Sequence, residues 1–242
     1  IVYNLVSMND IMTRVAAGRD YREEDFFFFN GQWHSWEHHG EFSRPDRSDA
    51  VDNANHVLEQ FRAVIQKAEL FILTASSSIV YRRKDSGKIV ANCHKVPQTE
   101  FIQELLSVED NRQILEQCCE HISRLNPRCR IVLTLAPVRH YPGNLMLNAR
   151  SKAHLLAAIH AVVDTKTEQL LYFPAWEIMM DELRDYRFYR DDMLHPTDLA
   201  VQIIFQRFIR ACFDADARQF IMAGEQRLRA AAHRPHAGKA AQ

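Results

Sequence analysis

The sequence lacks the strong basic excess of proteins that bind nucleic acids or anionic membrane surfaces. It also lacks the long apolar runs of proteins that span a membrane. Its 30 basic and 31 acidic side chains give a formal net charge of -1 over 242 residues. Binders of nucleic acids and of anionic membrane surfaces rely on a strong basic excess, so neither partner is expected. The longest apolar runs, residues 68–75 and 131–138, have the length of strands and fall far short of the ~20 residues that cross a bilayer.

A disulfide or metal framework is also missing from the sequence. The five cysteines form no Cys-x-x-Cys pair, and an odd number without a scaffold pattern is typical of reduced thiols. No secretory signal opens the chain, so we expect a cytoplasmic protein. No cofactor motif is present, and we expect the protein to need neither a cofactor nor a metal.

What the sequence does contain is an alternation of apolar strand-length segments with amphipathic helical segments. Such an alternation is typical of an α/β fold in which helices cover both faces of a parallel sheet. The aromatic segment, residues 21–46, is expected to be irregular and loop-rich or to form a short hairpin around Asn30-Gly31, and another hairpin is expected around residues 85–87. The expected helices are residues 4–17, 48–68, 97–126 with a break near Ser107, 149–166 and 196–213. The expected buried strands are 70–75 and 130–138, and residues 168–179 are expected to be a strand that runs into a loop.

Ligands of parallel sheets bind beyond the carboxyl ends of the strands, which directs attention to the segments that follow them. After the last strand comes "RDDMLHPTDLA", in which Asp192 and His195 have the spacing Asp-x-x-His. A carboxylate three residues before an imidazole, on a tight turn, can hold that ring in the tautomer that accepts a proton from a nucleophile. The spacing alone is short and common and also fits a surface acidic loop that happens to precede a histidine. Its place after the last strand makes a functional role an equal alternative. Pro196 suits the first position of a helix, so we expect His195 at a helix N-terminus.

Several longer stretches resemble one family in order along the chain. They are "YNLVSMNDIMTRV", "FNGQWHSWEHHGEFS", "VANCHKVP", "TLAPVRHYPGNLMLNARSKAHLLAAIHAVVD" and "YFPAWEIMMDELRDYRFYRDDMLHPTDLAVQIIFQRF". Together they resemble the GSCFA family, a branch of the SGNH/GDSL-type hydrolases, over residues 2–213. The resemblance implies a three-layer α/β/α sandwich of SGNH hydrolase type in residues 1–213, followed by a helical extension and a disordered tail in 214–242.

The resemblance also implies a catalytic role for Asp192 and His195, as the acid and base of a serine ester hydrolase or acyltransferase acting on a small-molecule or carbohydrate ester. The nucleophilic serine is expected in an N-terminal Gly-Ser-Cys-Phe-Ala block, which this sequence does not contain. The chain starts at Ile1 rather than at a methionine. We therefore expect an N-terminally truncated domain that is weakly active or inactive alone. The alternative is a catalytically inactive carbohydrate-binding or interaction domain derived from the same fold.

A second departure from the family pattern lies after residues 70–75, where relatives carry a glycine. This chain reads Thr74-Ala75-Ser76-Ser77-Ser78, and alanine or serine lets a backbone approach an oxyanion less readily than glycine does. The serines of this segment are themselves possible nucleophiles, but a polar exit from the strand is the better interpretation.

Two further segments supply candidate substrate-binding residues. The aromatic segment contributes Trp33, His34, Ser35 and His38, either as the lining of a substrate cleft or as packing anchors. A zinc site built on His34, His38 and His39 is the least favoured interpretation, because the glutamate of His-Glu-x-x-His is absent.

The second segment follows residues 130–138 and contributes Arg139 and His140. They can contact an anionic or hydroxylated substrate, or belong to a solvated loop.

Overall fold

The computed structural model describes residues 2, 4–139, 144–165 and 168–232. Its helices are α1 (Leu5–Ala17), α2 (Arg47–Lys67), α3 (Val108–Leu125), α4 (Leu145–Val163), α5 (Ala175–Glu177), α6 (Asp198–Cys212) and α7 (Ala215–Ala232). Its strands are β1 (Phe26–Phe29), β2 (Gln32–Ser35), β3 (Leu70–Ala75), β4 (Ile79–Arg83), β5 (Ile89–Val90), β6 (Phe101–Leu105), β7 (Arg130–Leu135) and β8 (Leu170–Phe173).

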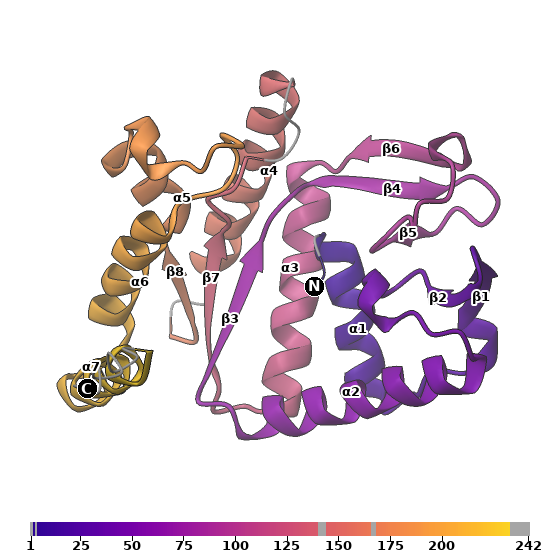
Figure 1. Cartoon of the computed structure of the whole chain (residues 1–242), viewed down its shortest axis with the longest axis horizontal. Helices are drawn as coiled ribbons and strands as arrows, with labels where there is room; N and C mark the ends of the chain where they lie inside the picture. Colours follow the sequence, from indigo (N-terminus) through magenta and orange to yellow (C-terminus); the bar gives the residue numbers. More distant parts are fainter. Residues whose placement is uncertain (1, 3, 140–143, 166–167, 233–242) are drawn as a thin grey trace, which may run out of the picture.

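The centre of the fold is a parallel sheet of order β3–β7–β8. In β7 every residue after Arg130 is buried, as befits a strand with neighbours on both sides. Helix α4 packs on one face of the sheet, with α3 against α4 and α1 against α3, and α5 and α6 pack on the other face (Figure 1). This three-layer α/β/α arrangement confirms the fold class expected from the alternating pattern.

Local capping explains where the long helices begin. The Asp46 carboxylate accepts hydrogen bonds from the backbone N–H groups of Ser48 and Asp49, at 2.8 and 3.2 Å, which starts α2. Ser107 and Asp110 form a reciprocal capping box that starts α3. This start of α3 confirms the break expected near Ser107.

The segment before Ser107 is a correction to the expected helix over 97–126. Residues Phe101–Leu105 form β6, which pairs antiparallel with β4 in a separate sheet of order β5–β4–β6. Pairing with a strand some twenty residues earlier overrides the local pattern, because β4 completes hydrogen bonds that a helix would have made internally.

Two other expectations about strands also need correction. Strand β3 is an edge of the described sheet and only half buried, with the Ile72 side chain 47% exposed. Strand β8 ends at Phe173, because Pro174 has no N–H to donate to a ladder, and the segment after it, expected to be a loop, is helical. The chain then continues through α5 and a π-helical turn, Ile178–Glu182.

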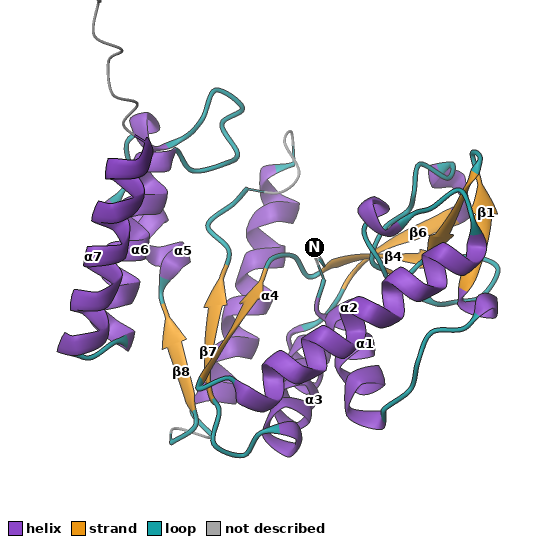
Figure 2. Ribbon diagram, turned by 60° about the horizontal axis from the view of Figure 1, so that its bottom comes forward, coloured by secondary structure: helices purple, strands orange, loops and turns teal. Residues whose placement is uncertain are grey.

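The two expected hairpins are confirmed. Asn30 and Gly31, with φ of 47° and 77°, join β1 to β2 in a two-residue turn, and Gly87 at φ 68° lies between β4 and β5. Both hairpins lie on the side of the molecule away from α5, α6 and β8, as two views of the chain agree (Figure 1, Figure 2).

Candidate functional site

Asp192 and His195 lie in a loop that the chain closes on itself before α6. The Arg190 N–H donates to the His195 carbonyl at 2.8 Å, and the Thr197 N–H donates to the Phe188 carbonyl at 2.8 Å. Met193, at φ 58°, makes the sharp reversal between the two functional residues. The loop is thus held from both ends by backbone hydrogen bonds.

The two side chains of the pair are in direct contact. Asp192 Oδ2 lies 2.6 Å from His195 Nδ1, and Asp192 Oδ1 accepts from the N–H groups of Leu194 and His195, at 2.8 and 3.0 Å. These two backbone donors, followed by the imidazole, lower the pKa of Asp192 to about 2. The carboxylate is therefore anionic at neutral pH and places the ring proton on Nδ1. His195 Nε2 forms no hydrogen bond with any described residue.

The position of His195 relative to α6 differs from the expectation. The helix begins at Asp198, and Thr197 is its cap, with the Thr197 hydroxyl accepting from the Ala200 N–H at 3.4 Å. Pro196 precedes the cap and pairs with Tyr189 in an isolated bridge instead of occupying the first helical position. His195 is thus held by this bridge and by Asp192, outside the first turn of the helix.

Arg139 joins this loop from the exit of β7. Its backbone N–H donates to the Leu194 carbonyl at 3.1 Å, beside His195. Its guanidinium lies 4.3 Å from the centroid of the Tyr189 ring and donates to Tyr189 Oη at 3.1 Å. The structure therefore brings Asp192, His195 and Arg139 together. His140, the other candidate in this segment, lies outside the described residues.

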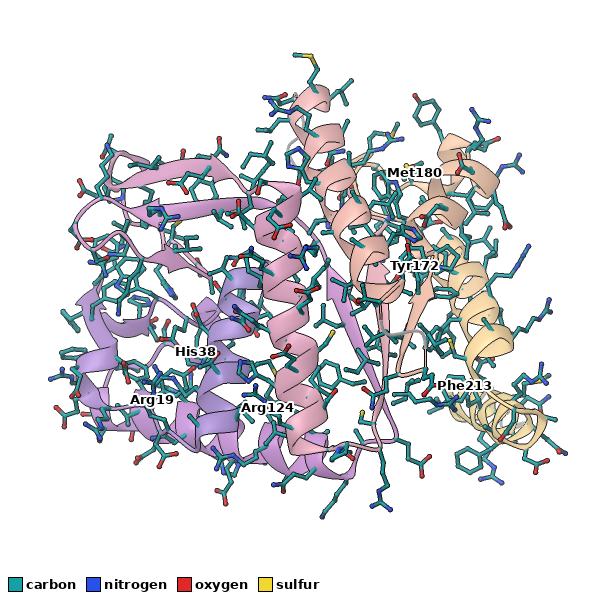
Figure 3. All side chains as sticks on the ribbon, turned by 180° about the vertical axis from the view of Figure 1, so that it is seen from behind. Arg19, His38, Arg124, Tyr172, Met180 and Phe213 are labelled. Carbon is teal, nitrogen blue, oxygen red and sulfur yellow. The ribbon has the colours of Figure 1, made fainter. Side chains whose placement is uncertain are left out.

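The four candidates of the aromatic segment lie elsewhere in the molecule. Trp33, His34 and Ser35 are in β2 and His38 follows it, on the side of the molecule away from the Asp192–His195 loop (Figure 1, Figure 2). Figure 3 shows the same separation, with His38 on the α1 side and Met180, whose sulfur contacts Tyr189 Oη at 3.6 Å, on the far side.

Packing and hydrogen bonding occupy most of the polar and aromatic groups of this segment. His34 is buried, with Nδ1 2.6 Å from Ser43 Oγ and Nε2 3.0 Å from the Phe29 carbonyl. One face of the Trp33 ring lies under the Arg47 guanidinium at 4.5 Å. These contacts agree with the packing-anchor interpretation and leave little ring surface for a sugar.

Burial shifts the pKa of two histidines in this region. Burial, with smaller effects of Arg14 and His94, lowers the pKa of His38 to about 4, and burial likewise lowers the pKa of His94 to about 4. Both rings are therefore neutral near pH 7. Among the described residues, no three His, Cys, Asp or Glu side chains are arranged to hold a metal ion.

Ser35 is the candidate of this segment that lines a cavity. The cavity has a volume of about 830 Å³ and lies between α1, the β1–β2 hairpin and the β4–β5 hairpin. Its walls carry many charges of both signs, among them Asp10, Arg14, Arg82 and Lys88. No sequence pattern marks any of these four side chains as functional.

A buried polar cluster at the carboxyl end of β3 was also missed. Ser78 Oγ donates to the Ser151 carbonyl, and the Ser78 N–H donates to Ser151 Oγ, both at 2.8 Å. Ser77 Oγ accepts from the Ile79 N–H at 3.0 Å. These hydroxyls stabilise the β3 exit against α4, which agrees with a polar strand exit and disfavours Ser77 and Ser78 as nucleophiles.

Lys152 lies beside this cluster on the buried face of α4. The sequence pattern of α4 indicates this burial. Lys152 shares a spacing of three and four residues with the apolar positions Leu155, Ile159 and Val162, which places it on the stripe that faces the sheet.

Comparison with known proteins identifies the family of this chain. No curated protein matches the chain. The model of the GSCFA family matches residues 1–208, from the start of the chain to the last turns of α6, and leaves α7 outside the match. With nearly the whole described α/β unit covered, the chain belongs to the GSCFA family.

Proposed function

We propose that this chain carries the acid and base of an SGNH-type serine ester hydrolase or acyltransferase. The observation that carries the proposal is the 2.6 Å contact between Asp192 Oδ2 and His195 Nδ1, which leaves Nε2 without a described partner. A neutral imidazole with its proton fixed on Nδ1 presents a basic Nε2, which is the arrangement that activates a serine hydroxyl.

Each residue has a defined role in the reaction. His195 Nε2 accepts the proton of the serine as its oxygen attacks the acyl carbon, and the Asp192 carboxylate stabilises the imidazolium that forms. The imidazolium then donates this proton to the leaving alkoxide, and water or an acceptor hydroxyl releases the acyl group by the same steps in reverse order.

The proposal takes the nucleophilic serine from a Gly-Ser block upstream of this chain, as the family resemblance implies. Ser77, Ser78 and Ser151 do not fill this role, because their hydroxyls are buried and engaged with one another and with the backbone. The substrate class we propose is an ester of a small molecule or carbohydrate. Arg139, fixed beside the loop, is positioned to contact an anionic or hydroxylated part of it.

We place this activity in the cytoplasm. All five cysteines lie among the described residues and are free thiols, as in reducing compartments. None of the helices in the described part of the chain is long and apolar enough to cross a bilayer.

The test is an ester hydrolysis assay on the protein translated from its complete natural reading frame. We expect release of p-nitrophenol from p-nitrophenyl acetate, and a loss of ~10²–10⁴-fold in kcat for His195→Ala. His56→Ala, at an exposed position on α2, is the matched control and retains activity. Residues 1–242 alone are expected to be weakly active or inactive.

Two outcomes would contradict the proposal. Turnover by residues 1–242 that is lost in His195→Ala would place the nucleophile within this chain. Saturable sugar binding without hydrolysis by the complete protein, unaffected by His195→Ala, would favour the inactive carbohydrate-binding alternative.

A further inference from the structure

Lys152 contacts the segments that follow all three strands of the parallel sheet. Its side chain extends from α4 and is 3% exposed. Nζ donates to the carbonyls of Ser76, after β3, and Ala136, after β7, each at 2.8 Å. It also lies 5.0 Å from the centroid of the Trp176 ring, after β8. One amine therefore joins the carboxyl ends of β3, β7 and β8.

No described carboxylate forms an ion pair with this lysine. Burial lowers the pKa of Lys152 to about 7, so part of the population is neutral at physiological pH. Burying an unpaired amine is costly, and an apolar side chain would fill the space at a lower cost. Unlike an apolar side chain, the amine donates hydrogen bonds to two backbone carbonyls. A neutral amine keeps two N–H groups, so this link persists on deprotonation.

The link determines the direction of the backbone after β3. The Ala75 carbonyl accepts from the Ala136 N–H at 2.8 Å, and the next carbonyl, that of Ser76, is held by Lys152. In a trans peptide the C=O and the following N–H point in opposite directions, so the Ser77 N–H points away from the amine. Lys152 thus constrains this peptide on one side, and the isolated bridge between Ser77 and Asn4 constrains the next residue.

The same amine is connected to the Asp192–His195 loop. From Ala136 the chain runs three residues to Arg139, whose N–H donates to the Leu194 carbonyl beside His195. A shift of the β7 exit would therefore move Arg139 and, through that hydrogen bond, the loop.

We propose that Lys152 is a positioning residue of the candidate site. It fixes the exits of β3 and β7 against each other and so sets the relative positions of the Ser76–Ser78 backbone and the Asp192–His195 loop. The effect on catalysis rests on the proposed function, whereas the effect on the backbone does not.

The experiment compares the wild type with Lys152→Met, which removes the donors, and Lys152→Gln, which keeps two N–H donors without charge. Lys84→Met, at an exposed position, is the matched control. Amide hydrogen exchange of Ala136 and Arg139 is measured by ¹⁵N NMR on residues 1–242. The kcat and KM for p-nitrophenyl acetate are measured on the complete protein.

In folded Lys152→Met we expect exchange at Ala136 and Arg139 to speed up by ~10-fold or more, with the β4–β6 amides unchanged. Misplacement of the loop should lower kcat by ~10–100-fold, with KM within ~2-fold of the wild type. The exchange rates and kcat of Lys152→Gln should lie between those of the wild type and those of Lys152→Met. The values for Lys84→Met should match the wild type.

The outcomes that would contradict the positioning role of Lys152 differ from the outcome that would contradict the proposed hydrolase activity. Unchanged exchange at Ala136 and Arg139 in folded Lys152→Met would overturn the positioning role. So would failure of both variants to fold, because Lys152 would then serve the fold alone. Faster exchange in a complete protein that hydrolyses no ester would support the positioning role and reject the hydrolase.

Discussion

Two single residues of this chain have lowered pKa values for different physical reasons. Asp192 is exposed, yet backbone N–H donors keep its pKa near 2, so its charge survives mild acidification. His38 is buried, and loss of hydration lowers its pKa to about 4. Local hydrogen bonds stabilise a charge at the first residue, whereas burial prevents one at the second.

Acid should therefore destabilise the hairpin region through His38. Its pKa is lower in the folded state than the 6.5 of an ordinary histidine, so the unfolded chain binds the extra proton between pH 6.5 and 4. The stability contributed by the neutral ring is fully present above pH 6.5 and is lost as the pH falls through about 4. We expect His38→Phe to weaken this loss by ~1–3 kcal/mol, measured as the free energy of unfolding in urea at pH 7 and pH 4.5.

Phenylalanine suits this position because the His38 ring packs on Tyr21 and Phe42, at centroid distances of 4.7 and 4.5 Å. The exposed His56→Phe serves as the control and should leave the pH dependence unchanged. An equal pH dependence in wild type and His38→Phe would show that other groups cause the acid response.

At the scale of elements, the start of α3 depends on a short capping motif. Ser107 Oγ accepts from the Asp110 N–H at 3.0 Å, and Asp110 Oδ2 accepts from the Ser107 N–H at 2.9 Å. Ser107→Ala removes the first bond and should lower the free energy of unfolding by ~1 kcal/mol, as measured by urea denaturation. Ser123→Ala, inside the same helix, should not destabilise the protein. A similar loss in both variants would argue against a capping role.

Strand β3 is the exposed edge of the described parallel sheet, and it carries an apolar side chain outward. Ile72 is 47% exposed, and flat apolar edges pair readily with other chains. Ile72→Lys should therefore reduce self-association of residues 1–242 by several-fold, as measured by sedimentation velocity. The control is Val64→Lys, at an apolar and still more exposed position on α2. An equal effect at Val64 would assign the change to net charge rather than to the edge.

At the scale of the molecule, α7 is peripheral to the α/β unit. The family match ends before it, and none of its described side chains is buried. Phe220 and Leu228 are 79% and 73% exposed. Removing the residues after Phe213 should therefore change the free energy of unfolding by less than ~1 kcal/mol, and the Tm by less than ~3 °C.

The contrasting variant in the full chain is Phe208→Ala on α6. Phe208 is buried between the rings of Phe173 and Phe213, at centroid distances of 5.1 and 5.7 Å. Its loss should cost ~3–5 kcal/mol, as read from thermal unfolding. If removal of α7 costs as much, the helix belongs to the cooperative unit after all.

Short-range features of this protein followed from the sequence alone. The Asp192–His195 contact spans three residues on one turn, so the spacing and the turn suffice to predict it. The break near Ser107 and the Asn30-Gly31 turn are equally local, since each is stabilised by groups within a few residues. The order of apolar strands and helices likewise predicted the α/β/α layers.

Only the tertiary structure decided the features that depend on residues far apart in the chain. Residues Phe101–Leu105 became a strand because β4 was available to pair with them. Arg139 joined the Asp192–His195 loop across 55 positions of sequence, counted from 139 to 194, through a single backbone hydrogen bond. Lys152 found its partners at the ends of two strands that the sheet brings together. Local sequence preferences do not predict such contacts, because these contacts form and contribute to stability only when the chain has folded.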